Sequence, residues 1–175
     1  MRWLLDGYNV IRRAPELTSR EQESLEAGRQ ALCALLVKVA RKSEDTFTVV
    51  FDGVQSGGRS GGGAGVSVIF SSARESADRV LSRMAREGGA VVSNDREVRR
   101  AAERAGAVVV TTDQFLARLD QTRVAAPEPS AGDKDGEEDE TSSGPRKGNP
   151  RRLSKKDRAT RRALGRLNPD RRPRS

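Results

Sequence analysis

Four aspartates stand at the ends of short apolar runs that the sequence predicts as β-strands, or in the first turn of the helix after one. They are Asp6 in LLDGYN, Asp52 in VVFDG, Asp78 in ESADRV and Asp95 in VVSND. Sites of parallel α/β sheets form beyond the carboxyl ends of the strands, so we expect these carboxylates to gather at one edge. They would repel one another unless a divalent cation lay among them. Such a cation lowers the pKa of a bound water and stabilises a phosphoryl transition state, so the spacing predicts metal-assisted hydrolysis of a phosphodiester.

Two uncharged side chains accompany these acids. Asn9 follows Asp6 by one tight turn and offers a neutral oxygen as a ligand or as a hydrogen-bond partner. Ser93 ends the apolar run that precedes Asp95 and is placed to orient a ligand or a water. We therefore add Asn9 and Ser93 to the candidate site.

The chain contains no histidine. This absence excludes His-based acid–base catalysis, Ser-His-Asp triads and zinc sites that use histidine. A metal would have to be held by carboxylates, carbonyls and water, and these hard oxygen ligands suit Mg²⁺ or Mn²⁺. Cys33 is the only cysteine and lies in an apolar helical pattern, which indicates a small core residue and no intrachain disulfide.

Each aspartate also has a structural explanation that involves no metal. Asp6 and Asn9 suit a glycine-containing turn, and Asp52 begins a common Asp-Gly turn pair. Asp78 and Asp95 near helix starts complement the helix dipole, and the stretch NDRE around Asp95 resembles a capping box. The shared position of the four acids at strand ends favours one metal site over four separate structural roles.

The elements that must position these residues alternate along the chain. Apolar and β-branched runs predict strands, and periodic apolar positions predict the helices between them. The expected strands cover 2–6, 46–52, 65–71, 90–95 and 107–112, and the expected helices cover 17–42, 71–89, 96–106 and 112–121. Thr18 with Glu21, or Ser19 with Gln22, is a candidate capping box for the first helix. Alternating strands and helices predict a three-layer α/β domain with a mainly parallel sheet.

The net charge of +8 is unevenly distributed. Residues 1–124 carry +3, residues 125–144 carry −6 and residues 145–175 carry +11. We predict a folded domain over 1–122, a disordered acidic linker over 123–145, and a basic tail over 146–175 that becomes partly helical when bound. The cations of the tail are typical of a segment that contacts RNA, with salt-dependent affinity.

A glycine-rich segment and the absence of apolar runs complete the outline. Residues 57–65 read GGRSGGGAG, which lacks the ending of a phosphate-binding loop and predicts a surface loop, or a mobile flap over a polymer substrate. No apolar run of about 18 residues predicts a membrane span, and the first residues do not resemble a secretion signal. We therefore expect a cytoplasmic protein without membrane contact.

The motifs together resemble the YacP-like branch of the NYN domains, bacterial ribonucleases with a PIN-like fold. The resemblance covers roughly residues 1–120 and depends on LLDGYNVI, VVFDG, VIFSSARESADRVL and VVSNDREV, in this order. It implies a metal-dependent endoribonuclease that acts on mRNA, with the ribosome as a candidate partner. By motif match the acid cluster is Asp6, Asp52, Asp78 and Asp95, with Asn9 beside Asp6.

The chain departs from this family at two places. Such domains often carry a second acid directly after the one in the Ala-Asp pair, where this chain has Arg79; Glu75, about one turn earlier, is the candidate replacement. The stretch after ERAGA reads VVVTTDQF instead of a small-residue segment that contains serine. Arg79, and Arg59 on the glycine-rich segment, are candidate contacts to the RNA backbone.

Two alternatives to an endoribonuclease remain open. One is a non-catalytic RNA- or ribosome-binding protein, which would bind without metal-dependent cleavage. The other is a phosphatase with an aspartate nucleophile, which the sequence disfavours because Tyr8 stands where a second acid is normally needed.

Overall fold

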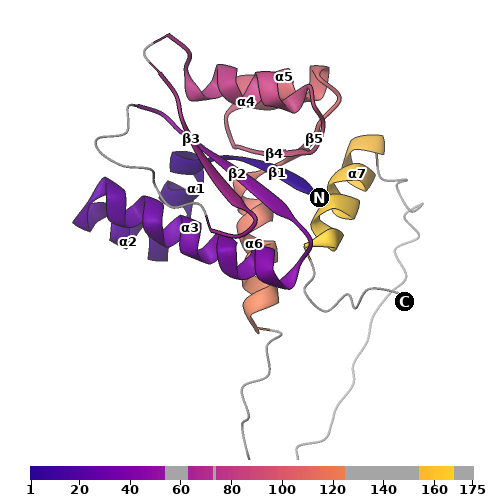
Figure 1. Ribbon diagram of the computed structural model, residues 1–175. Helices are drawn as coiled ribbons and strands as arrows, with labels where there is room; N and C mark the ends of the chain where they lie inside the picture. The colour runs from indigo at the N-terminus through magenta and orange to yellow at the C-terminus, as the bar shows by residue number, and fades with distance from the viewer. Residues whose placement is uncertain (54–62, 73, 125–153, 168–175) are drawn as a thin grey trace, which may run out of the picture.

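A five-stranded parallel sheet forms the centre of the computed structural model, which describes residues 1–53, 63–72, 74–124 and 154–167 (Figure 1). The strand order is β3-β2-β1-β4-β5, and every neighbouring pair is parallel. The strands are β1 (Arg2–Asp6), β2 (Thr46–Phe51), β3 (Val66–Phe70), β4 (Ala90–Val92) and β5 (Val108–Val110). The chain adds β2 and β3 on one side of β1, and then β4 and β5 on the other. This reversal creates a switch point at the carboxyl end of β1, where α/β sheets bind ligands.

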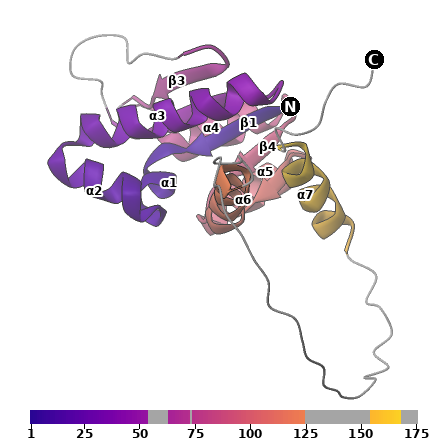
Figure 2. The same cartoon turned by 90° about the horizontal axis from the view of Figure 1, so that it is seen from below.

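Helices cover both faces of the sheet, which confirms the predicted three-layer architecture (Figures 1 and 2). One apolar cluster lies between the sheet and the first three helices with α6 and α7, and a second lies between the sheet and α4 with α5. Successive residues of β1 serve the two layers in turn, because Trp3 and Leu5 enter the first cluster and Leu4 the second. The helices are α1 (Gly7–Arg13), α2 (Pro15–Glu23), α3 (Leu25–Lys42), α4 (Ala77–Ala85), α5 (Arg96–Arg104), α6 (Thr112–Val124) and α7 (Lys155–Arg166).

The single helix predicted over 17–42 is wrong, because two helices occupy this stretch. The chain is extended at Ser24, with φ −166° and ψ 154°, and the Ser24 hydroxyl accepts a hydrogen bond from the Ala27 backbone N–H at 3.0 Å. Neither predicted capping box begins α2, which starts with Pro15 at its first turn. Ser24 thus ends one helix and caps the next, and the apolar periodicity of the stretch does not reveal this break.

The glycine turn expected after Asp6 is also wrong, because α1 begins at Gly7. The Asp6 side chain caps this helix by accepting a hydrogen bond from the Asn9 backbone N–H at 3.2 Å. Gly7 is needed for space, since a Cβ added there would lie within 3.0 Å of three atoms of the Phe51 ring. Helix α1 therefore starts directly against the end of β2, and this brings the side chains that follow Asp6 to the switch point.

Part of the segment predicted as a basic tail is packed on the domain as α7. Leu167 at the end of α7 is fully buried in the first apolar cluster. The Thr160 hydroxyl donates to the Val109 carbonyl of β5 at 2.9 Å, and Lys156 forms an ion pair with Glu103 at 2.6 Å. The acidic linker from residue 125 onward, and Arg59 with most of the glycine-rich segment, lie outside the described residues and stay predictions. No helix in the described ranges combines the length and the apolar character that a membrane span requires.

Candidate active site

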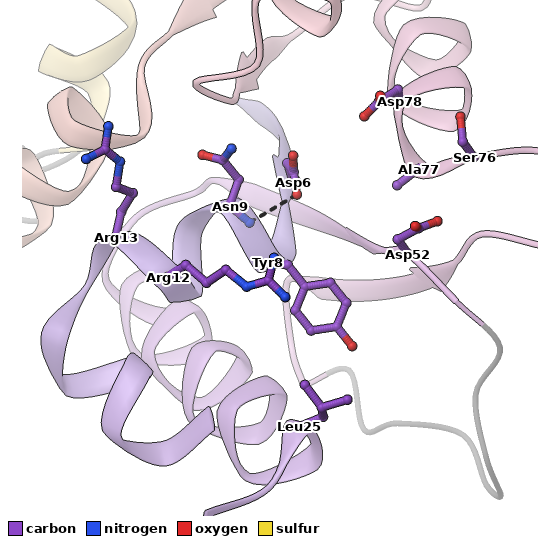
Figure 3. Close-up of a pocket in the computed structure, with 10 residues that line it drawn as sticks. All are labelled: Asp6, Tyr8, Asn9, Arg12, Arg13, Leu25, Asp52, Ser76, Ala77 and Asp78. Carbon is purple, nitrogen blue, oxygen red and sulfur yellow. Dashed lines mark hydrogen bonds between the residues drawn. The ribbon is translucent and has the colours of Figure 1, made fainter. Parts of the chain in front are cut away.

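A cavity of about 550 Å³ lies at the carboxyl ends of β1 and β2 and contains three of the four predicted aspartates (Figure 3). Asp6 ends β1, Asp52 follows β2, and Asp78 comes from the first turn of α4. Three chain segments that are distant in the sequence therefore meet at the switch point of the sheet. The lining residues are Asp6, Tyr8, Asn9, Arg12, Arg13, Leu25, Asp52, Ser76, Ala77 and Asp78.

Asp6 belongs to two elements at the cavity, because it ends β1 and its side chain caps α1. Burial raises the pKa of its carboxyl above the ordinary value, and the negative charges of Asp78 and Asp95 raise it further. Hydrogen bonds from the Asn9 backbone N–H and the Ser93 hydroxyl act in the opposite direction and lower the Asp6 pKa. The carboxylate is thus held in place by two donors in surroundings that favour its protonated form.

A serine that the sequence reasoning missed fixes Asp52. The Ser71 hydroxyl donates to Asp52 Oδ1 at 2.5 Å and accepts from the Gly53 backbone N–H at 3.0 Å. Ser71 directly follows β3 and is buried. Its position one residue beyond a strand, like that of Ser93 after β4, was the available signal.

Asp78 brings a second perturbed carboxyl to the cavity. Desolvation raises its pKa first, and the charges of Asp95, Asp52 and Glu97 raise it further. Because the acids disfavour each other's ionisation, a bound cation would relieve the repulsion between them. Even so, among the described residues no three acidic or cysteine side chains are close enough together to hold one metal ion between them.

Asp95, the fourth predicted aspartate, does not line the cavity. Its Oδ1 accepts hydrogen bonds from the backbone N–H groups of Glu97 at 2.6 Å and Val98 at 3.1 Å, so it caps α5. This is the structural role that the sequence left open, with Asp95 itself as the cap. Asp95 nevertheless lies near enough to raise the pKa of Asp6 and of Asp78.

Asn9 connects three segments. Its side-chain oxygen accepts from the Thr112 hydroxyl at 2.8 Å and from the Asn94 backbone N–H at 3.3 Å. Asn94 in turn accepts from the Thr112 backbone N–H at 3.0 Å. Both hydrogen bonds to Asn9 are structural, so this oxygen ties α1 to the loop after β4 and to the start of α6.

Ser93 links two of the predicted acids and is fully buried. Its hydroxyl oxygen accepts from the Asp95 backbone N–H at 3.0 Å, and it hydrogen-bonds the Asp6 carboxyl. It therefore orients a carboxyl at the cavity, while the predicted role of Ser93 in orienting a ligand or a water stays a prediction.

Two other predicted residues, Glu75 before α4 and Arg79 on α4, do not line the cavity. Both carboxylate oxygens of Glu75 pair with Arg83 at 3.1 Å, and this contact lowers the pKa of Glu75. Arg79 is exposed on α4, and its charge also acts on Glu75. Glu75 is thus engaged by Arg83 outside the cavity lining, and its role as a replacement for the acid at position 79 stays a prediction.

The side of the cavity formed by α1 is aromatic and basic, which the sequence reasoning missed. The Tyr8 hydroxyl accepts from Arg29 Nε at 2.9 Å and also from Nη2 of the same guanidinium. The Arg12 guanidinium lies over the Tyr8 ring, 5.3 Å from its centroid. The pattern YNVIRR contained Tyr8 and Arg12, but only the packing of α1 against α3 and β2 places them in the lining of the same cavity as the aspartates.

Comparisons with known proteins agree on one group. A family model described as the YacP-like NYN domain matches residues 3–162. The crystal structure of Rae1 (YacP) from Bacillus subtilis is similar, with a TM-score of 0.62 and 24% identity over 71% of this chain and 77% of that chain. The crystal structure of a point mutant of the same protein gives a TM-score of 0.59 and 24% identity over 69% and 75% of the two chains. At this identity the similarity establishes a shared fold. No curated protein matches the chain.

Proposed function

Because this chain belongs to the YacP-like NYN domain family, we propose that it is a metal-dependent endoribonuclease that hydrolyses phosphodiester bonds of single-stranded RNA. Proteins with NYN and PIN-like domains are generally nucleases, and membership supports a nuclease-type function connected with RNA. The observation that carries the proposal is the meeting of Asp6, Asp52 and Asp78 in one cavity at the sheet's switch point. Such a set of carboxylates without histidine suits phosphodiester hydrolysis assisted by a divalent cation.

The donors in the cavity fit a hydrated Mg²⁺ or Mn²⁺. Proteins bind Mg²⁺ through one or two carboxylates and leave several waters in place, so three acids around one ion are not required. Asp6 and Asp78, whose pKa values are raised by burial and by neighbouring acids, are the residues that we expect to hold the ion, with Asp52 completing the set. When bound, the ion would supply Lewis-acid stabilisation of the phosphoryl group and a nucleophile at neutral pH.

The protein's own contribution is to fix these carboxyls before the substrate arrives. Ser93 and the start of α1 hold Asp6, while Ser71 holds Asp52. Preorganised groups need no rearrangement during the reaction, and this is the main source of electrostatic stabilisation in enzymes. Asn9 contributes indirectly, because its hydrogen bond to Thr112 ties α1, which holds Asp6, to the start of α6.

The direct test is cleavage of an end-labelled single-stranded RNA by the purified protein with Mg²⁺, with Mn²⁺ and with chelator. We expect cleavage that the chelator abolishes and that Asp6→Asn and Asp78→Asn each lower at least about a hundredfold. Glu87→Gln is the matched control, since it removes an exposed acid beyond the end of α4. Cleavage that persists in the Asp6→Asn, Asp78→Asn double variant would refute the assigned site.

One set of observations favours a second candidate, a non-catalytic RNA- or ribosome-binding protein. Asp95 is engaged as a helix cap, the Asn9 oxygen is engaged by Thr112, and the described residues contain no group of three acids around one ion. This candidate predicts RNA binding that survives Asp6→Asn and Asp78→Asn, together with no cleavage that depends on metal. The cleavage assay and a filter-binding assay on the same variants separate the two functions.

We further propose that the substrate is mRNA, that the ribosome is a partner, and that the protein acts in the cytoplasm. The outward side of α7 supports a contact with RNA, because it exposes Lys155, Arg158, Arg161, Arg162 and Arg166. Such a cluster of cations binds phosphate backbones without reading sequence. Sedimentation with ribosomes should therefore weaken in an Arg158→Glu, Arg162→Glu variant while cleavage of short RNA stays unchanged.

A further inference from the structure

The side of the cavity that faces the aspartates is apolar and cationic (Figure 3). Leu25, at the start of α3, lines the cavity with half of its surface exposed. It is the only large apolar side chain in the described ranges that is exposed to this extent. An exposed leucine at the rim of a cavity with three acids has no role in binding a cation, so it indicates a contact with another part of the substrate.

Arg12 and Tyr8 extend this side. Arg12 Nε lies 3.5 Å from Glu21 Oε1, and its guanidinium lies over the Tyr8 ring, while its side chain keeps 66% of its surface exposed. Tyr8 is itself fixed by a hydrogen bond from Arg29 and by the Phe51 ring. The centroids of the two rings are 5.2 Å apart and their planes make an angle of 64°. Two contacts thus hold a guanidinium plane that remains open to the cavity.

From these contacts we propose that Leu25 and Arg12 form a subsite for one unpaired nucleobase next to the phosphodiester at the aspartates. The inference rests on the proposed function and specifies how the substrate is recognised. RNA places a flat, weakly polar base beside each phosphate, and proteins bind such bases by stacking on guanidinium planes and by apolar contact. A base inside a duplex is stacked between its neighbours, so the subsite accepts only a nucleotide that is unpaired.

Binding is measured by fluorescence anisotropy in the Asp78→Asn background with Mn²⁺, so that the RNA stays intact. The probe is a labelled single strand of about 12 nucleotides, within the range that single-strand-binding folds cover. A matched set of probes replaces one nucleotide at a time by an abasic one, and a duplex of the same sequence completes the set. Leu25→Ala and Arg12→Gln are the test variants; Leu25 is exposed, so its truncation leaves the core intact. Arg41→Gln, in the last turn of α3, controls for the loss of one positive charge.

Leu25→Ala and Arg12→Gln are each expected to weaken binding of the intact strand about tenfold, the usual effect of losing one stacked base. One abasic position should weaken binding by a similar factor, and that penalty should largely disappear in Leu25→Ala, because both changes remove the same contact. Arg41→Gln should have little effect, and the duplex should bind weakly to every variant.

An abasic penalty that is the same in Leu25→Ala as in the background protein would overturn the subsite, as would equal affinity for single strand and duplex. Cleavage by the unsubstituted protein is measured separately. Metal-dependent cleavage with no effect of Leu25→Ala on base recognition leaves the nuclease and removes the subsite. Base-dependent binding without any cleavage leaves the subsite and removes the catalytic function.

Discussion

Replacing Gly7 by alanine should destabilise the domain and displace the candidate site. A Cβ at this position would come within 3.0 Å of three atoms of the Phe51 ring, whereas carbon atoms in contact normally lie about 3.5 to 4.0 Å apart. Phe51 is fully buried, and its ring packs against Tyr8 and Phe70, with ring centroids 5.2 Å and 5.8 Å away. Neither side of the contact has free space to move into, so α1 must shift away from β2.

The size of the effect follows from the cost of overpacking a core. Inserted methyl groups typically cost about 1 to 3 kcal/mol, and this contact belongs at the upper end because it involves three ring atoms. For a chain of this length, 1 kcal/mol corresponds to roughly 2 to 4 °C in Tm. Gly7→Ala should therefore melt about 6 to 12 °C below the parent protein. Because Asp6 and Tyr8 flank Gly7, cleavage should fall even at temperatures where the variant is folded.

Thermal unfolding followed by circular dichroism measures the change, with Gly165→Ala as the control. Gly165 lies within α7 and a Cβ there meets nothing within 4 Å, so alanine should stabilise that helix by up to about 1 kcal/mol. Adding Phe51→Leu to Gly7→Ala should recover part of the lost stability by making room for the methyl group. A Gly7→Ala protein that melts at or above the parent temperature would refute the steric argument.

Three further predictions concern charge, a buried network and α7. The Asp6 pKa is raised in the folded protein, so the protonated carboxyl stabilises the fold. This stabilisation is intact below the unfolded pKa of 3.8 and is lost as the pH rises through the folded pKa. Asp6→Asn, which retains a capping oxygen, should therefore raise the urea midpoint at pH 7 and leave it nearly unchanged at pH 3, while cleavage is lost. Asn9→Ala leaves the buried Thr112 hydroxyl without its acceptor and should cost about 1 to 3 kcal/mol in urea denaturation, most of which should disappear in a Thr112→Val background. Leu167→Ala should cost about 2 to 5 kcal/mol in the same assay, whereas the exposed Arg162→Ala should change stability little; equal effects would contradict the packing of α7.

The sequence located the strands and the acids at their ends. The runs VVF at the end of β2 and AVV of β4 are buried at every position, so their apolar character is continuous and visible without any tertiary contact. Asp6 and Asp52 follow such runs directly, and Asp78 begins the helix after the third. Parallel strands place their carboxyl ends at one edge, so the meeting of these three acids followed from local patterns and one topological rule.

Several elements were beyond the reach of local patterns. Ser24 interrupts a stretch with good helical periodicity, because a serine side chain can serve either as a helix cap or as an exposed helical residue. Helix α1 begins at Gly7 directly after β1, at a position where Phe51, 44 positions away, leaves no room for a side chain. The basic segment around Leu167 has too few apolar residues to fold alone, and it folds as α7 because β5 and α6 offer it a surface.

The sequence by itself therefore determined the α/β class, the positions of the strands, and which oxygen-bearing side chains stand at the strand ends. Only the tertiary structure decided which of them do structural work instead. Asp95 carries the same carboxyl group as the acids in the cavity, yet it caps α5. Asn9 does line the cavity, but its side-chain oxygen accepts from Thr112, 103 positions away. A polar side chain bonds to whatever donor packing brings within reach, and packing also placed Leu25 and Arg12 opposite the acids. That choice is made by contacts between distant segments, which no short stretch of sequence contains.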